Sequence, residues 1–298
     1  MMKKWSICVF MLVLLLLTGC GGAPAPQTAE NEQEIAIRLA TNYRDDSIGY
    51  QQLQDFARLL QEKSGNTMLV KLYSAGEWSQ AESFVDYVKL GSLEMACLEP
   101  AEMQRLQPAY ELYQQPYLFT TLQAVESYIT GDVGRKALDT LPVEYYGIGF
   151  VPDGFQYLLR SDDVQWVSYG ALKNMGQTKA LEGIAVYDLR AVYSLQLVVT
   201  MRSWWDGLTE EQQNWVQESF SQALTSSFAQ QEDKDPAQML LANGVVFEDN
   251  TASAWNSYSN LYLNQREAYF AEHSNSLTAY WRPVVAEPPT KEEEEPTP

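Results

Sequence analysis

Apolar and polar residues alternate along the chain in the patterns of buried strands and amphipathic helices. Apolar runs predict strands over 35–40, 68–73 and 95–98, and apolar positions at helical spacing predict helices over 49–63 and 79–89. A glycine follows each of these helices, where a left-handed turn commonly ends one. The order of strand, helix, strand, helix, strand predicts an α/β fold with a mostly parallel sheet. In such a sheet, ligands bind beyond the carboxyl ends of the strands.

The second half of the chain carries further elements but no internal repeat. Strands are predicted over 146–150, 155–159 and 193–200, and helices over 122–140, 209–230 and 251–273. The first of these helices is interrupted near Gly131. Aromatic residues share one face of the last helix, and such a face more often packs in a core than binds a partner.

The first twenty residues have the layout of a secretion signal. Lys3 and Lys4 precede an apolar run over 7–17, and the segment ends in Leu-Thr-Gly-Cys at Cys20. This ending resembles the bacterial lipobox, which implies that 1–19 is a lipoprotein signal peptide and that Cys20 carries a lipid. An ordinary signal with a chance cysteine and an uncleaved anchor are the alternatives.

Two low-complexity segments are predicted to flank the folded body. Residues 20–33 are rich in Gly, Ala and Pro, a composition typical of a flexible tether. Residues 285–298 include four consecutive glutamates, which repel one another, so this segment is predicted to be a disordered acidic tail.

Composition excludes several classes of function. The 298 residues carry 39 acidic and 20 basic side chains, a formal charge of −19, which argues against nucleic acid as a partner. Three cysteines and a single histidine are too few for a zinc site or a disulfide framework. No nucleophile or phosphate-binding motif is present, so we predict neither an enzyme, a cofactor nor a metal. Apolar neighbours predict that Cys97 is buried and inert.

Several segments resemble one protein family in their amino-acid sequence and in their order along the chain. They are Ala40–Tyr43, Phe56–Gly65, Leu90–Ala96, Gln115–Phe119, Gly131–Gly134, Gly147–Phe150 and Trp204–Leu208. Together they resemble the DctP-type solute-binding proteins, the extracytoplasmic receptors of TRAP transporters. The resemblance implies a two-lobed clamp of the periplasmic-binding-protein type. Such a clamp binds an organic anion, usually a carboxylate held by an arginine of the second lobe, and delivers it to a membrane permease.

The chain departs from the family where that arginine is expected. The stretch between Asp163 and Tyr169, which in the family carries this arginine, is much shorter than usual, and Gln156 follows Gly-Phe where the family has a second arginine. We therefore expect a first lobe over 34–153 and a truncated second lobe with crossover strands over 154–202. The C-terminal helices over 203–284 are expected to pack across both lobes.

Six residues are candidates for ligand contact. Tyr43, Glu77, Trp78 and Glu99 follow first-lobe strands, and Gln156 and Arg190 belong to the second lobe. Two carboxylates without the usual arginine would favour a cation, an amine or a neutral molecule over a dicarboxylate. Each of these residues also has an ordinary interpretation in packing, on the rim of the cleft or in a surface ion pair.

The sequence thus predicts a solute-binding lipoprotein of a TRAP-type transporter, anchored on the extracytoplasmic face of a bacterial membrane. The expected partners are a small-molecule solute, the TRAP permease subunits, and the membrane through the lipid on Cys20. The alternative is a degenerate binding protein that serves as an interaction or sensing module of the envelope without transport.

Overall fold

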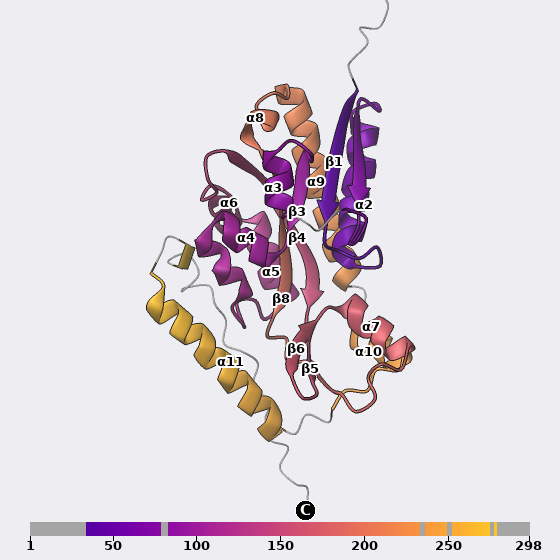
Figure 1. The fold of residues 1–298 in the computed structure, drawn as a ribbon, viewed down its shortest axis with the longest axis vertical. Coiled ribbons are helices and arrows are strands. Elements are labelled where there is room, and N and C mark those ends of the chain that lie inside the picture. Colours follow the sequence, from indigo (N-terminus) through magenta and orange to yellow (C-terminus); the bar gives the residue numbers. More distant parts are fainter. Residues whose placement is uncertain (1–33, 79–82, 233–235, 249–251, 275–276, 279–298) are drawn as a thin grey trace, which may run out of the picture. The chain divides into compact units, whose positions relative to one another are not determined.

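The computed structural model describes residues 34–78, 83–232, 236–248, 252–274 and 277–278 (Figure 1). The chain divides into Met1–Glu34 and Ile35–Pro298, and the fold described below belongs to the second part. The predicted signal peptide, tether and acidic tail lie outside the described residues. Within the described ranges, no helix combines the length and the apolar character needed to cross a membrane.

A five-stranded sheet in the order β2-β1-β3-β8-β4 forms the larger part of the fold. Its strands are β1 (Ile35–Thr41), β2 (Met68–Tyr73), β3 (Met95–Leu98), β4 (Tyr145–Phe155) and β8 (Tyr193–Met201). β1 pairs in parallel with β2 and β3, as predicted, whereas β8 pairs antiparallel with both β3 and β4. The predicted α/β class is confirmed, with parallel pairing confined to the first three strands.

Helices cover both faces of this sheet. They are α2 (Ile48–Lys63), α3 (Phe84–Lys89), α4 (Pro100–Leu106), η1 (Pro108–Gln114), α5 (Leu122–Thr130), α6 (Asp132–Leu138), α8 (Arg202–Trp205) and α9 (Glu210–Glu232). Side chains of β3 point alternately to the two faces, so Ala96 and Leu98 join one core and Met95 and Cys97 the other. Cys97 is fully buried, as predicted, and burial raises the pKa of its thiol.

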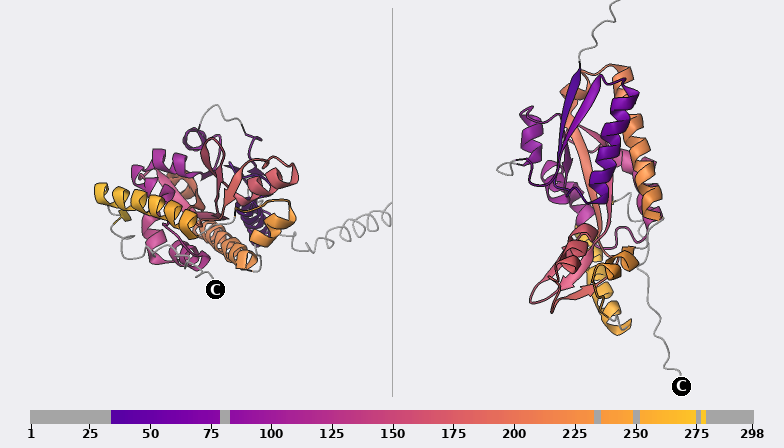
Figure 2. Two further views of the ribbon diagram at one scale, coloured as in Figure 1. Left: turned by 90° about the horizontal axis from the view of Figure 1, so that it is seen from below. Right: turned by 90° about the vertical axis from the view of Figure 1, so that its right-hand side faces the viewer.

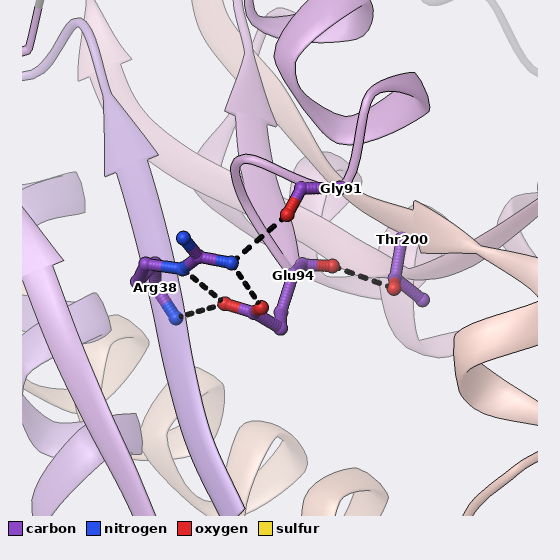
Figure 3. A network of polar contacts seen from close by, with 4 residues as sticks. All are labelled: Arg38, Gly91, Glu94 and Thr200. Carbon is purple, nitrogen blue, oxygen red and sulfur yellow. Dashed lines mark hydrogen bonds and ion pairs between the residues drawn. The ribbon is translucent and has the colours of Figure 1, made fainter.

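One polar network ties β1, β3 and β8 together at the start of β3 (Figure 3). The Arg38 guanidinium donates to both carboxylate oxygens of Glu94, at 2.9 and 2.6 Å, and to the Gly91 carbonyl at 2.9 Å. The backbone N–H of Arg38 also donates to Glu94, and Thr200 donates to the Glu94 carbonyl at 2.6 Å. Because these contacts join three strands, they help to fix the register of the sheet.

A smaller antiparallel sheet follows the end of β4. Its order is β6-β5-β7, with β5 (Tyr157–Arg160), β6 (Val164–Val167) and β7 (Ala185–Tyr187), and helices α7 (Tyr169–Gln177) and α10 (Pro236–Ala242) accompany it. Gly176 of α7 packs closely against the end of α10: a Cβ added there would lie only 2.6 Å from the carbonyl oxygen of Asn243, the residue that follows α10. We call the large sheet with its helices and the small sheet with its helices the two lobe-like parts of the fold, and a ligand site is expected between them.

The last long helix, α11 (Ala252–Glu272), contacts both parts (Figure 2). Near its start, the rings of Tyr258 and Tyr262 lie 5.2 Å from those of Tyr187 and Trp166, beside the small sheet. Near its end, Tyr269 and Phe270 are buried in a core of the large sheet. The aromatic face predicted for this helix therefore packs against the rest of the protein.

Candidate ligand-binding site

A cavity of about 400 Å³ lies between the two sheets, at the carboxyl end of β4. Elements of both parts contribute to its wall. The lining residues are Asp46, Ile48, Gln51, Leu122, Asp153, Gly154, Phe155, Tyr157, Tyr169, Lys173, Asp188, Arg190, Tyr193, Gln231, Pro236, Ala237 and Met239. This volume suits a small organic molecule.

Local backbone geometry places the start of α2 and the end of β4 beside the cavity. Ser47 caps α2 by accepting from the Tyr50 N–H at 3.1 Å, and so begins the helix beside the cavity wall. The register of β4 shifts between Pro152 and Gly154, and Gly154 has φ +99. A β-bulge of this kind redirects side chains, and it brings Asp153 and Phe155 to the wall.

Two cations line the cavity from the side of the small sheet. Lys173 comes from α7, and Arg190 comes from the connection between β7 and β8. The Arg190 guanidinium carbon lies 5.7 Å from the centre of the Phe155 ring. Among the described residues, neither cation has a carboxylate partner within 4.0 Å. Both charges are therefore available to a ligand.

Asp153 is the most buried acid on the wall, with 6% of its surface exposed. Its Oδ1 accepts from the Gly49 N–H at 2.9 Å, in the first turn of α2. Burial raises the pKa of Asp153 to about 7, despite the helix N–H groups that stabilise the carboxylate, and the charge of Asp46 adds to the rise. Asp46 itself is exposed and pairs with Arg44 at 3.1 Å.

Aromatic rings supply much of the remaining wall. Tyr193 donates from its hydroxyl to Gln231 Oε1 at 3.3 Å. The Tyr169 hydroxyl, by contrast, is shielded from solvent and has no hydrogen-bond partner in the described protein. A buried hydroxyl without a partner is energetically costly, so a ligand that bonds to it would gain affinity.

Of the six candidates from the sequence, the structure brings Arg190 to the cavity wall. Tyr43 is buried below it, with its hydroxyl donating to the Val151 carbonyl at 3.0 Å. Gln156 donates its backbone N–H to the Val192 carbonyl at 2.8 Å, and its side chain is not part of the wall. Both residues flank the site without lining it.

The other three candidates lie elsewhere at the strand ends. Glu77 is exposed and accepts from the N–H and hydroxyl of Ser74, which lower the pKa of its carboxyl. The Trp78 ring packs edge-on against Tyr73 at 4.8 Å. Glu99 precedes α4 without a side-chain capping bond. None of the three contributes to the described cavity wall.

Sequence reasoning did not single out Asp153, Tyr169 and Lys173. Asp153 stands directly before the Gly-Phe pair, and the other two lie in the stretch just after the shortened segment. Their positions beside family-like segments were the available signal. Among the described residues, no group of three His, Cys, Asp or Glu side chains could hold a metal ion.

Residues 39–161 match the DctP family, described as bacterial extracellular solute-binding protein, family 7. The fold matches a TRAP periplasmic solute-binding protein from Ochrobactrum anthropi with a TM-score of 0.70 at 16% identity, covering 85% of this chain and 95% of that one. Over residues 39–161, the chain resembles the DctP family. Its α/β fold matches the clamp fold of solved TRAP solute-binding proteins, as the sequence predicted.

Two similar proteins have named ligands. The sugar acid binding protein DctPAm from Advenella mimigardefordensis, solved with galactonate, has a TM-score of 0.68 at 16% identity and matches over 85% of this chain and 98% of that one. The C4-dicarboxylate-binding protein DctB from Bacillus subtilis is 22% identical over 227 residues, which is 76% of this chain and 54% of the relative. The chain spans about half the length of the curated relatives it matches, at 54% and 48%.

Proposed function

We propose that this protein is a DctP-type solute-binding protein that captures a small organic carboxylate in the cavity between its two sheets and delivers it to a TRAP-type membrane permease. The observation that carries the proposal is the pair of cations, Lys173 and Arg190, that face the cavity without a carboxylate partner among the described residues. Relatives of the same fold that were solved with galactonate, succinate and D-glucuronate support a carboxylate as the ligand.

Each cation has a distinct role in this proposal. The planar guanidinium of Arg190 can donate two parallel hydrogen bonds to one carboxylate, which a lysine cannot reproduce. The ammonium of Lys173, on α7, adds a second positive charge on the same side of the cavity. Arg190 therefore takes over the role of the carboxylate-holding arginine that the family carries in the stretch shortened here between Asp163 and Tyr169.

A ligand screen by thermal unfolding tests the proposal. The panel is succinate, galactonate, glucuronate and aminocarboxylates of similar size. A ligand at one hundred times its dissociation constant stabilises the folded state by about 2.7 kcal/mol, or roughly 5–10 °C in a protein of this size. The double variant Arg190→Met with Lys173→Met should lose this shift. Arg58→Met, an exposed cation on α2, is the control and should keep it. A panel without any stabilising carboxylate would refute the proposal and favour a sensing module.

We further propose that the protein is tethered outside the cytoplasmic membrane through a lipid on Cys20. The lipobox-like Leu-Thr-Gly-Cys segment supports this anchor. Replacing Cys20 with serine should move the protein from the membrane fraction to the soluble fraction and abolish labelling by radioactive palmitate. Cys97→Ser, which removes a buried thiol, is the matched control and should change neither property. Unchanged labelling of the Cys20 variant would contradict the anchor.

A further inference from the structure

We propose that the cavity selects a zwitterion, a small carboxylate that also carries an ammonium group, over a dicarboxylate of the same length. This inference rests on the proposed function, because it places the ligand carboxylate at Arg190 and Lys173. The ammonium group is assigned to the opposite wall, at the Asp153 carboxylate.

Charges of opposite sign stand on the two sides of the cavity. Lys173 and Arg190 come from α7 and the β7–β8 connection, whereas Asp153 and Asp46 come from β4 and the segment before α2. No ion pair joins these two sets in the described protein. A dicarboxylate held at the two cations would bring its second carboxylate toward Asp153 and Asp46, which would repel it.

Asp153 has hydrogen-bond donors but, among the described residues, no counter-charge beside it. The donors are the N–H groups of Ile48 and Gly49 and the Ser47 hydroxyl, at the start of α2. The other groups that interact with it are the acid Asp46 and the neutral side chains of Tyr43, Cys97 and Tyr193. Burial raises the pKa of these tyrosines and of the thiol, so they stay uncharged near neutral pH. A ligand ammonium would supply the missing positive charge, whereas a second ligand carboxylate would add repulsion.

The two ligand classes therefore differ in the sign of their pH dependence. With the pKa of Asp153 near 7, an ammonium binds the ionised carboxylate, and the affinity for a zwitterion should rise about tenfold between pH 6 and pH 8. A dicarboxylate binds best when Asp153 is protonated, so its affinity should fall over the same range.

Titration calorimetry on the full chain in mild detergent provides the test, with two matched pairs of probes. These are succinate with 4-aminobutyrate, and glutarate with 5-aminopentanoate, each measured at pH 6, 7 and 8. The zwitterion of at least one pair should bind at least tenfold more tightly than its dicarboxylate at pH 8, with an affinity that rises with pH. Dicarboxylate binding alone, or a falling affinity for the zwitterion, would overturn the inference and leave the proposed function standing. If neither class binds and the carboxylate screen also fails, both proposals fall.

The variant Asp153→Asn removes the carboxylate charge but keeps the shape of the side chain. Asparagine can still accept from Gly49, and the loss of a buried charge should leave the melting temperature at pH 8 no lower than that of the wild type. The variant should bind the zwitterion at least tenfold more weakly at pH 8 and lose the pH slope, while dicarboxylate affinity rises. Asp132→Asn, an exposed acid on α6 that pairs with Arg135 and does not line the cavity, is the control and should change zwitterion affinity less than threefold. Equal effects of both variants would contradict the assignment to Asp153.

Discussion

The contact between Arg266 and Tyr117 links the last helix to the segment that carries Arg190. Arg266 is 5% exposed, and its guanidinium donates to the buried Tyr117 carbonyl at 3.0 Å. Tyr117 has φ +54, donates its N–H to the Ala191 carbonyl at 2.5 Å, and donates its hydroxyl to Ser259 at 2.9 Å. These bonds hold the left-handed backbone of Tyr117 in place. They also fix Ala191, which adjoins the cavity-lining Arg190.

Replacing Arg266 with methionine should therefore destabilise the protein. The Tyr117 carbonyl would lose this partner, and an unsatisfied buried acceptor costs about 1–3 kcal/mol. The left-handed backbone conformation of Tyr117 costs about 1–2 kcal/mol, and in the variant the remaining contacts alone must offset this cost. The ion pair of Arg266 with Glu267 adds little, because the Glu267 side chain is 62% exposed. We expect a loss of about 2–3 kcal/mol, which lowers the melting temperature by roughly 5–10 °C.

Urea unfolding and calorimetry measure this loss, and ligand titration measures its effect on the site. Glu267→Gln removes the exposed partner alone and should change stability by less than about 0.5 kcal/mol. Because Ala191 adjoins Arg190, carboxylate affinity should also fall in the Arg266 variant. Wild-type stability of Arg266→Met, or an equal loss in Glu267→Gln, would refute the reasoning.

Three further changes test the fold. Burial acts to raise the pKa of Glu94, but the bonds and charge of Arg38 outweigh it, so this pKa lies below its ordinary value and the stability it contributes is lost as pH falls below about 4.5. Glu94→Gln should lose about 1–2 kcal/mol at pH 7 by urea unfolding, with a smaller loss at pH 3.5. A methyl group at Gly176 would meet the Asn243 carbonyl, so Gly176→Ala should cost about 1–3 kcal/mol in the same assay. Cys97 should react with a thiol reagent only after unfolding, and rapid native reaction would contradict its burial.

The sequence could predict those features that depend on local patterns. Apolar runs located β1, β2 and β3, and the interruption at Gly131 separates α5 from α6 as expected. The antiparallel return of β8 between β3 and β4 depends on pairing across a hundred residues, which periodicity does not encode.

The cavity was harder to predict for the same reason. The rule that ligands lie beyond strand ends points to the edge of the sheet where the cavity lies, but it does not separate wall residues from their neighbours. Tyr43 is buried because its hydroxyl reaches the Val151 carbonyl on β4, 108 residues away. Lys173 and Asp153 line the same cavity only because α7 and the bulge in β4 both lie beside it. Arg190 was found because the absent family arginine directed attention to the nearest replacement.

Native mass spectrometry of the full chain, purified without denaturation from cells that produce it, tests directly whether the cavity holds a carboxylate. We expect one bound carboxylate-containing molecule per protein, absent from the Arg190→Met, Lys173→Met double variant and retained by Arg58→Met. A wild-type protein free of any small molecule, even after incubation with extracts of its growth medium, would refute binding of a carboxylate in this cavity. So would a ligand that the double variant retains in full.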